Sequence, residues 1–336
     1  MQRLELVHQW LSGLFPGQPH SVAPASADAS FRRYFRVTFD DGLTRIVMDA
    51  PPEHEDCRPF VHVAGLLQDA GVHAPEILAQ DLEHGLLLLT DLGSATYLDA
   101  LAESNADSLF GDALDALVKW QLASRPDALP PYDEALLRRE LNLFPGWYVA
   151  RHLGTPLTAP QQETLEGVQR LLLQNILAQP RVFVHRDYMP RNLMVCADNP
   201  GVLDFQDAVV GPISYDVASL FRDAFISWEE ERVLDWAVRY WEKAGRAGLP
   251  VVADFGAFYR DMEWMGLQRH LKVAGIFARL TLRDGKPQYL ADTPRFINYL
   301  LSTCARYIEL KPLLRLIQKV EGIVEPNVFG FGASQR

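Results

Sequence analysis

The stretch VHRDYMPRNLMVCADNPGVLDFQD (residues 184–207) places a histidine, three aspartates ahead of its last residue and two asparagines among short apolar runs. His185, Asp187 and Asn192 form the pattern H-x-D-x-x-x-x-N, and Asp204 follows within the apolar run VLDF. The apolar runs predict short strands that hold these polar side chains. A polar loop between two core strands would explain the first pattern alone, but the flanking strands and the spaced Asp204 favour a functional site.

This segment resembles the catalytic segment of protein kinases and their relatives, in which H-R-D-x-x-x-x-N is followed by an Asp before Phe. Transfer of a γ-phosphoryl group needs a carboxylate near the acceptor hydroxyl, and the resemblance gives this catalytic role to Asp187. Mg²⁺ prefers carboxylate and amide oxygens, so Asn192 and Asp204 are the expected metal ligands. ATP is the implied co-substrate.

Two departures separate the chain from protein kinases. Met189 stands where those enzymes usually carry Lys, and the segment after Asp204 runs directly toward a helix without an activation loop. Gly211-Pro212 and Asp216-Val217-Ala218 instead resemble the aminoglycoside phosphotransferase family. The resemblance extends from Phe31 to beyond Asp216 and implies an α+β, two-lobed, protein-kinase-like fold.

Three longer strings narrow the resemblance: SADASFRRYFRV, VMDAPPE and YRDMEWMGLQRHLKVAGIFARL. They are similar to bacterial kinases that phosphorylate the anomeric hydroxyl of N-acetylmuramic acid and N-acetylglucosamine. That likeness implies a sugar 1-phosphate product and a role in cell-wall (peptidoglycan) recycling. Two alternatives stay open: a kinase acting on an aminoglycoside or another small hydroxyl compound, and a non-catalytic, nucleotide-binding pseudokinase.

Hydrophobic periodicity supports this division into lobes. Residues 31–39 and 43–50 alternate about the turn at Asp40-Asp41-Gly42, which predicts a β-hairpin. Residues 57–71 read as a helix, and residues 76–92 as two strands about a turn at residues 83–85. We therefore predict a small antiparallel-sheet N-lobe over residues 1–91 and a mainly helical C-lobe over residues 92–336. The C-lobe helices are expected at residues 97–102, 107–124, 132–150 and 160–178, and from residue 214 on.

Kinases of this fold carry a Lys on the third strand that holds the nucleotide phosphates. Here the corresponding position falls at Met48 or Asp49, and no Lys precedes Lys119. Ser30 and Arg33, in the first hairpin, are the candidate replacements. Arg33 is chosen on the assumption that Phe35 faces the nucleotide, because strand alternation puts both on one face; a solvated strand charge is the alternative.

The remaining candidate contacts follow from the family resemblance. LLLLTDLG resembles the family hinge, so the carbonyl of Thr90 and the amide of Leu92 are expected to meet adenine. A sugar pocket needs hydrogen-bonding groups and an aromatic wall. The candidates in the helical part, where aromatic helix faces more often belong to a core, are Asp223, Arg260, Glu263, Trp264, Arg269 and His270.

Composition limits the other partners. The formal net charge of −11 argues against nucleic acid and anionic membrane as general partners. Three widely spaced cysteines form neither a metal-ligand pattern nor a disulfide framework, which fits a reducing compartment. The N-terminal residues 1–15 read as an amphipathic helix instead of a signal peptide. We expect a cytoplasmic protein with no obligate protein partner.

Overall fold

The computed structural model describes residues 3–27 and 31–323 of the 336-residue chain. The chain divides into two units. The first unit contains residues up to 130 together with 182–216 and 238–251, and the second contains residues 131–181, 217–237 and 252 onward. The lobe boundary near Asp91 therefore lies inside the first unit and stays a prediction.

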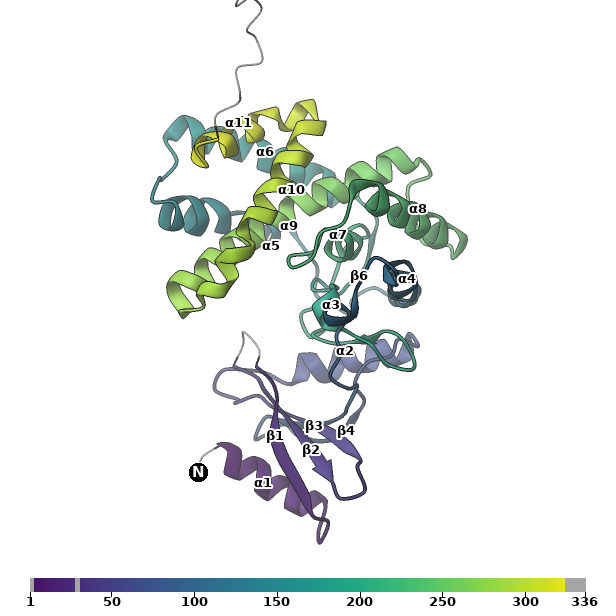
Figure 1. Ribbon diagram of the computed structural model, residues 1–336. Coiled ribbons are helices and arrows are strands. Elements are labelled where there is room, and N and C mark those ends of the chain that lie inside the picture. Colours follow the sequence, from purple (N-terminus) through teal and green to yellow (C-terminus); the bar gives the residue numbers. More distant parts are fainter. Residues whose placement is uncertain (1–2, 28–30, 324–336) are drawn as a thin grey trace, which may run out of the picture. The chain divides into compact units, whose positions relative to one another are not determined.

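A five-stranded antiparallel sheet forms the β-rich part of the first unit, in the spatial order β1-β2-β3-β5-β4 (Figure 1). The predicted hairpin joins β2 (Arg33–Phe39) to β3 (Thr44–Asp49). The second predicted pair comprises β4 (Ile77–Asp81) and β5 (Leu86–Thr90). Gly85 between them has a φ of +70°, a left-handed conformation that glycine adopts without steric cost.

The edge strand β1 (His20–Ala27) is an element that the sequence did not predict. Its sequence, HSVAPASA, contains few β-branched or aromatic residues and includes a proline. β1 pairs with β2, and the register shifts between Pro24 and Ser26. Because proline cannot donate to a ladder, an irregular edge strand is where a sheet accommodates it.

The two faces of the sheet have different neighbours. One face packs against α1 (Arg3–Leu14), whose Val7 and Leu11 are fully buried, so the predicted N-terminal helix is confirmed. The sheet side chains in this cluster are Phe35, Val37, Phe39, Val47, Leu86 and Leu88. Because successive strand residues point to opposite faces, Tyr34 and Arg36 lie on the other face.

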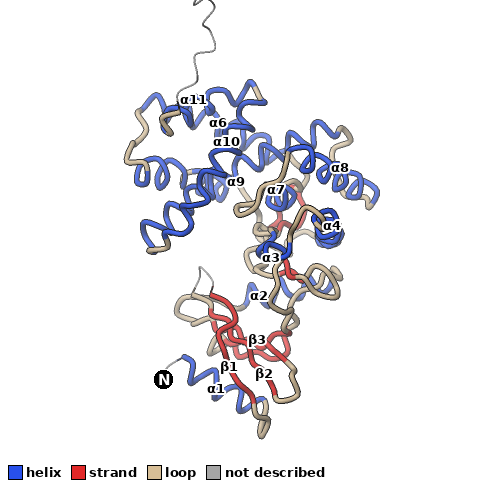
Figure 2. The backbone as a smooth tube through the Cα atoms, viewed as in Figure 1, coloured by secondary structure: helices blue, strands red, loops and turns tan. Residues whose placement is uncertain are grey.

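The first unit continues with helices and short strands. α2 (Arg58–Asp69) confirms the helix predicted before Gly71, and it is followed by α3 (Tyr97–Ala100) and α4 (Ala106–Leu122). The segment around the H-x-D-x-x-x-x-N pattern forms two small sheets, which Figure 2 shows as short strands among loops. Its elements are β6 (Arg181–Val184), the 3₁₀-helix η2 (Pro190–Asn192), β7 (Leu193–Met194), β8 (Gly201–Val202) and β9 (Val209–Pro212).

The described part of the second unit is helical. Its core helix is α9 (Phe255–Asp284), which contacts α6 (Ala159–Ala178) and α10 (Thr293–Arg306). The other elements are α5 (Glu134–Leu141), η1 (Phe144–His152), η3 (Pro287–Asp292), η4 (Ile308–Leu310) and α11 (Lys311–Val320). α7 (Tyr215–Phe221) and α8 (Glu230–Arg246) contribute residues to both units.

One predicted helix proved to be two elements. The periodicity over residues 132–150 predicts a continuous helix, whereas the structure has α5 followed by η1, a π-helix with Pro145 in its first turn. Proline lacks the N–H that would continue the helical ladder, which explains the change at this point.

A buried carboxylate ties α5 to α9. Glu140 accepts hydrogen bonds from the Tyr132 hydroxyl and from Gln268 Nε2 at 3.1 Å, and it forms an ion pair with Lys272 at 3.1 Å. All three partners lie in the second unit. A buried charge that is paired and hydrogen-bonded in this way fixes the packing of the two helices, because removing one partner leaves the other unpaired.

Packing in the second unit gives a first prediction. A Cβ added at Gly275 of α9 would lie 2.4 Å from the backbone carbon of Leu143. Backbone cannot move aside cheaply, so Gly275→Ala is expected to destabilise the protein by about 1–3 kcal/mol. Thermal unfolding monitored by circular dichroism measures the loss.

Gly167→Ala in α6 is the matched control, because its added Cβ meets only the far end of Arg170 at 3.8 Å. This substitution removes a helical glycine, so it is expected to leave stability unchanged or to raise it by up to about 1 kcal/mol. Equal melting temperatures for the two variants would contradict the packing described here.

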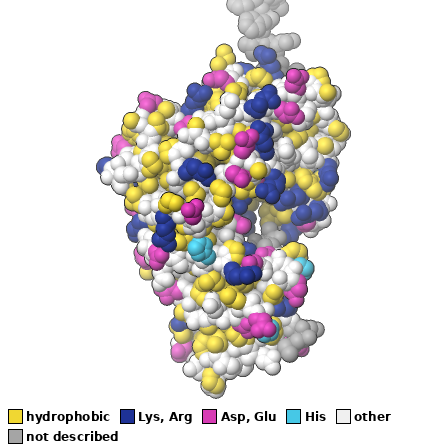
Figure 3. All heavy atoms as spheres, turned by 180° about the vertical axis from the view of Figure 1, so that it is seen from behind, with side chains coloured by type: hydrophobic (Ala, Val, Ile, Leu, Met, Phe, Trp, Pro, Cys, Tyr) yellow, Lys and Arg dark blue, Asp and Glu magenta, His cyan; other side chains and the backbone are white. Residues whose placement is uncertain are grey.

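Charged side chains of both signs are spread among hydrophobic ones on the face drawn in Figure 3. None of the helices within residues 3–27 and 31–323 combines the length and apolar character that crossing a membrane requires.

Candidate active site

The loop after β6 is held by a buried aspartate. Asp216 is fully buried, and its carboxylate accepts the backbone N–H groups of His185 at 2.7 Å and Arg186 at 3.0 Å. Arg186 has a φ of +76°, a conformation that costs energy for a residue with a side chain. The two hydrogen bonds to Asp216 stabilise this turn, which carries Asp187 at its end.

Asp187 occupies the position of the expected catalytic carboxylate. Its backbone is fixed at both ends, because its N–H donates to His185 Nδ1 at 3.3 Å and its carbonyl accepts from Asn192 Nδ2 at 2.9 Å. Its half-buried carboxylate accepts no hydrogen bond from the described residues. The loop therefore fixes the backbone position of Asp187, and its carboxylate is available to an external hydroxyl.

His185 supports this loop as a neutral group. Burial lowers its pKa to about 4, so the imidazole is uncharged at neutral pH. Its Nδ1 accepts the Asp187 N–H, and its ring meets Tyr188 edge-on at 5.6 Å. These contacts give His185 a structural role in holding the loop.

Asn192 and Asp204 lie side by side. Asn192 Nδ2 is 3.3 Å from Asp204 Oδ2. The backbone N–H of Leu203, the residue before Asp204, also donates to the Asn192 carbonyl at 2.9 Å. The other Asp204 oxygen accepts from Gln206 Nε2 at 2.8 Å. Asp204 has a φ of +63°, which places its carboxylate at a tight bend directly after β8.

The donor set of this pair fits Mg²⁺. The amide nitrogen of Asn192 is directed at Asp187 O and Asp204 Oδ2, so its Oδ1 is left as a ligand beside a carboxylate. Among the described residues there is no cluster of three or more His, Cys, Asp or Glu side chains that could hold a metal alone. Mg²⁺ commonly takes one or two protein oxygens, with nucleotide phosphates and water completing its shell, and this site matches that type.

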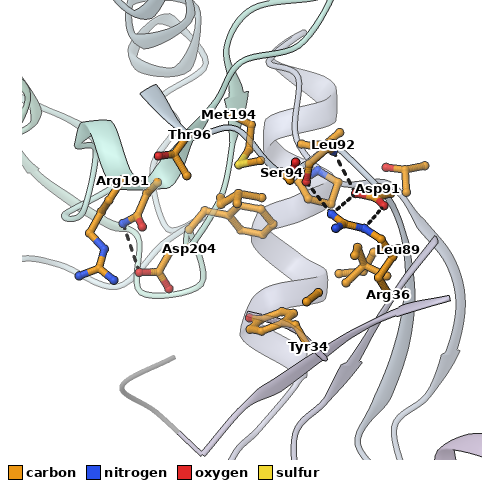
Figure 4. A pocket seen from close by; sticks show the side chains of 18 of the residues that line it. Tyr34, Arg36, Leu89, Asp91, Leu92, Ser94, Thr96, Arg191, Met194 and Asp204 are labelled. Carbon is orange, nitrogen blue, oxygen red and sulfur yellow. Dashed lines mark hydrogen bonds and ion pairs between the residues drawn. The ribbon is translucent and has the colours of Figure 1, made fainter. Parts of the chain in front are cut away.

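A cavity of about 310 Å³ lies between the sheet and this pair, within the first unit (Figure 4). Its lining brings together the face of the sheet opposite α1, the segment after β5, and the ends of β7 and β8. The lining residues include Tyr34, Arg36, Ile46, Phe60, Leu89, Thr90, Leu92, Arg191, Asn192, Met194, Leu203 and Asp204. The apolar side chains of the lining form walls suited to a flat ring. Asn192 and Asp204, the expected metal ligands, line the same cavity.

The predicted hinge residues Thr90 and Leu92 both line this cavity. Within the described part of the chain, the Leu92 N–H donates to no carbonyl or side chain, which leaves it available to an adenine nitrogen. Asp91 between them is bound by Arg36, with distances of 2.6 Å and 3.1 Å from the two guanidinium nitrogens (Figure 4). Burial alone would raise the pKa of Asp91, but the hydrogen bonds from Arg36 and Gly93 outweigh it and lower the pKa.

The position of the missing lysine is occupied by a buried ion pair. Asp49, at the end of β3, is fully buried and binds the guanidinium groups of Arg3 and Arg33, with Nε distances of 3.0 Å and 3.1 Å. Phe35 belongs to the cluster against α1, so the assumption that it faces the nucleotide was wrong. Arg33 lies on that same face and does not line the cavity. Ser30 lies outside the described residues.

The neighbouring arginine at the start of the same hairpin was considered but not chosen. Arg32 forms an ion pair with Glu55 at 2.9 Å, and both side chains are largely buried, with 11% and 14% of their surface exposed. Glu55 also accepts the backbone N–H of Phe31 at 3.3 Å. Arg32 directly precedes β2, and continued alternation would put it on the face of Tyr34 and Arg36, although Arg32 itself does not line the cavity. The sequence shows this alternation. We chose Arg33 instead because we expected Phe35, on the same face as Arg33, to face the nucleotide.

The six sugar-binding candidates all lie in the second unit and fall into two groups. In the first, Glu263 is buried and accepts from the Tyr307 hydroxyl at 2.5 Å, while Trp264 meets Tyr307 edge-on. Arg260 stacks over Trp264 at 4.5 Å and pairs with Glu309 at 3.2 Å. Most of these contacts join α9 to the segment that follows α10.

The second group comprises Asp223, Arg269 and His270. Asp223 is fully buried, which raises its pKa, and its Oδ2 accepts the N–H groups of Phe225 and Ile226. Arg269 is 2% exposed. His270 Nε2 is bonded to the Arg222 carbonyl at 3.0 Å, and burial lowers the pKa of His270 to about 3. None of the six lines a described cavity, so their roles in sugar binding stay predictions.

Comparison with known proteins places these observations in a family. Residues 21–255 match the model of the phosphotransferase enzyme family. An N-acetylmuramate/N-acetylglucosamine kinase of Pseudomonas aeruginosa is 55% identical over 325 residues, which cover 94% of this chain and 96% of the relative. A kinase of the same name from Neisseria meningitidis is 49% identical over 326 residues, covering 96% and 97%.

Solved structures agree with the fold. An ADP-bound aminoglycoside phosphotransferase superposes with a TM-score of 0.58 at 13% identity, covering 88% of this chain and 97% of that one. A choline kinase from Streptococcus pneumoniae gives a TM-score of 0.61 at 13% identity, covering 90% and 100%. These likenesses show the fold alone.

Fold and site together define an enzyme of the protein-kinase-like class that transfers phosphoryl groups. Within that class, the chain belongs to the phosphotransferase enzyme family. The resemblance to aminoglycoside phosphotransferases, the α+β kinase-like fold class and the expectation of a kinase are thereby confirmed.

Proposed function

We propose that this protein is a sugar kinase that transfers the γ-phosphoryl group of ATP to the anomeric hydroxyl of N-acetylmuramic acid or N-acetylglucosamine. The observation that carries the proposal is the arrangement of Asp187, Asn192 and Asp204 around one loop beside a nucleotide-sized cavity. The acceptor is taken from the relatives, whose names give both sugars at 49–55% identity. The product is the sugar 1-phosphate, and its use in peptidoglycan recycling belongs to the same proposal.

Asp187 orients the acceptor hydroxyl and takes up its proton as the new bond to phosphorus forms. A carboxylate suits this role when it lies within hydrogen-bond reach of the hydroxyl and has no competing internal donor. The Asp187 carboxylate meets the second condition within the described residues. The backbone hydrogen bonds to His185 and Asn192 hold the loop that carries the carboxylate, which favours a defined position for the acceptor hydroxyl.

The cavity of the first unit binds ATP in this proposal. Adenine lies between the apolar side chains of the sheet and those of Met194 and Leu203, with its edge at Thr90 and Leu92. Asn192 Oδ1 and the Asp204 carboxylate hold Mg²⁺, which when bound neutralises negative charge on the nucleotide phosphates. Asp91 and Arg36 shape the hinge by their ion pair and are themselves neutralised by it.

Arg32 replaces the missing lysine. In protein kinases the phosphate-binding Lys is paired with a Glu of the following helix. Here Glu55, just before α2, pairs with Arg32 in a largely buried setting. Arginine presents several donors, so one edge can bind Glu55 while another meets a phosphate oxygen.

Arg32→Met is therefore expected to raise the KM for ATP by about tenfold, because one charge-assisted hydrogen bond is lost. Steady-state kinetics with varied Mg·ATP measures this change. Arg58→Met is the matched control, because Arg58 is exposed and, among the residues that the structure describes, pairs only with neighbouring Asp56. An unchanged KM in the Arg32 variant, or an equal rise in the control, would remove Arg32 from the nucleotide site.

A substrate panel tests the proposed function as a whole. ATP consumption is measured with Mg²⁺ and, separately, N-acetylmuramic acid, N-acetylglucosamine, choline and kanamycin. The proposal predicts turnover with the two N-acetylated sugars and little or none with the two cations. Turnover confined to kanamycin or choline would overturn the proposed acceptor while leaving the kinase class intact.

A further inference from the structure

Arg191 is an exposed arginine on the lining of the first-unit cavity, directly before the expected metal ligand Asn192. Asp204, the other expected ligand, lines the same cavity. Figure 4 shows Arg191 and Asp204 on one side of the cavity and the hinge residues Asp91 and Leu92 on the other. A nucleotide whose adenine lies at the hinge therefore extends its phosphates toward Arg191.

The backbone at Arg191 is fixed by the short 3₁₀-helix η2. Pro190 and Asn192, on either side of Arg191, are both buried. The Asn192 N–H donates to the Met189 carbonyl at 2.8 Å, and the Leu193 N–H donates to the Pro190 carbonyl. A 3₁₀-helix turns by about a third of a circle per residue, so the residue between two buried neighbours points in a different direction from them. The loop thus holds Arg191 beside Asn192 with its side chain exposed.

Arg191 brings positive charge to the end of the cavity where the nucleotide phosphates are expected. Among the described residues, the cationic side chains on the lining are Arg36 and Arg191, and the carboxylates are Asp91 and Asp204. Arg36 is bound to Asp91 at 2.6 Å and to the Gly93 carbonyl at 2.7 Å, so its charge is used at the hinge. Arg191 is the lining cation on the side of Asp204, where phosphates and metal ion meet in the proposed function.

Two lysines of protein kinases are absent from their usual places in this chain. The strand position holds Met48 or Asp49, and Met189 stands where the catalytic loop of those enzymes usually carries Lys. Arg191 follows Met189 by two positions in the same loop. During phosphoryl transfer, negative charge is spread over the equatorial oxygens of the moving group, and Arg or Lys side chains stabilise it. The loop therefore keeps a cation for this task, placed next to Asn192.

We propose that Arg191 is a catalytic residue that binds the γ-phosphoryl group of ATP while it is transferred. The inference rests on the proposed function and deepens it, because it names the side chain that stabilises the reacting group. The acceptor oxygen bonds to the γ-phosphorus, the bond from that phosphorus to the bridging oxygen breaks, and its electron pair leaves with ADP. The acceptor proton goes to Asp187. Arg191 donates N–H groups to the γ-phosphoryl oxygens, and its planar fork can bind two of them at once.

Nucleotide binding without any sugar tests which phosphate Arg191 contacts. Isothermal titration calorimetry with Mg²⁺ measures the dissociation constants of ADP and of the non-hydrolysable ATP analogue with an imido bridge, which carries the γ-phosphoryl group that ADP lacks. Arg191→Met retains the apolar stem of the side chain and removes its donors. It is expected to weaken binding of the analogue about tenfold, the loss of one charge-assisted pair, and to change ADP binding less than about twofold.

Turnover tests the role of Arg191 in the transfer itself. At saturating Mg·ATP and N-acetylglucosamine, Arg191→Met is expected to lower kcat by about 10²- to 10³-fold, the usual loss when one donor to the transition state is removed. Arg191→Lys keeps the charge but loses the paired donors, so its kcat is expected to lie between those of wild type and Arg191→Met. The Lys variant takes the place of Arg191→Met if that variant fails to fold.

Arg125→Met is the matched control, because Arg125 is an exposed arginine of the same unit whose guanidinium lies 3.4 Å from Asp69. It should leave both dissociation constants and kcat unchanged. Equal effects of Arg191→Met on ADP and the analogue, or wild-type kcat in that variant, would overturn the inference while the proposed function stands. If wild-type protein phosphorylates neither sugar, the proposed function itself fails, and the two nucleotide affinities still decide whether Arg191 contacts the γ-phosphoryl group.

Discussion

Replacing Asp187 with Asn is expected to lower kcat by about 10²- to 10⁴-fold, the usual contribution of a positioned acid or base. Asn keeps the shape of the side chain but cannot take up the proton of the acceptor hydroxyl. The loop should persist, because the contacts of Asp187 with His185 and Asn192 are made by its backbone. Nucleotide affinity, measured by calorimetry with ADP, should therefore change less than about twofold.

Asp198→Asn provides the matched control for this prediction. Asp198 is an exposed aspartate of the same segment, and its recorded contacts with His73 and Cys196 are made by its carbonyl. It should retain wild-type kcat. Wild-type turnover in the Asp187 variant would show that the acceptor proton leaves by another route, and a parallel loss of ADP affinity would indicate damage to the nucleotide site instead.

Replacing Asp204 with Asn is expected to lower kcat/KM by about 10²- to 10³-fold, because a charged metal ligand is lost where negative charge is concentrated. Asn is the substitution of choice, since it tolerates the left-handed φ of +63° at this position better than other side chains. The variant should also need more Mg²⁺ for half-maximal activity. A magnesium titration of the initial rate at saturating ATP measures both effects.

Asp207→Asn serves as the control, because Asp207 is exposed and its recorded contact with Arg186 is made by its carbonyl. It should show the wild-type magnesium dependence. If Asp204→Asn lost activity with an unaltered magnesium requirement, Asp204 would be acting through Gln206 or Asn192 and not through a metal ion.

The local features that sequence predicted best are those that depend on few residues. The hairpin between β2 and β3 follows from alternation about Asp41-Gly42, and α2 follows from apolar spacing ended by Gly71. The resemblance to the kinase segment led us to expect Asn192 and Asp204 to lie side by side, and they do so because the short strands β7 and β8 between them pair with each other.

What the sequence could not supply depends on long-range partners. Arg33 and Arg32 are adjacent and chemically identical, and only the packing of Phe35 against α1 decides which of them faces the cavity side of the sheet. β1 was missed because its pairing with β2 overrides weak strand propensity. Likewise, the hydrogen bond from Arg295 to Ser227 joins residues separated by 68 positions with no shared motif.

The most direct test of the account is the site of phosphorylation on the product. N-acetylmuramic acid or N-acetylglucosamine is incubated with the protein and Mg·ATP, and a proton–phosphorus correlation spectrum is recorded. The account predicts a cross-peak between the new phosphate and the anomeric proton, absent when Asp187→Asn protein is used. A cross-peak to the protons of the primary alcohol instead, or inorganic phosphate as the sole new signal, would contradict transfer to the anomeric hydroxyl.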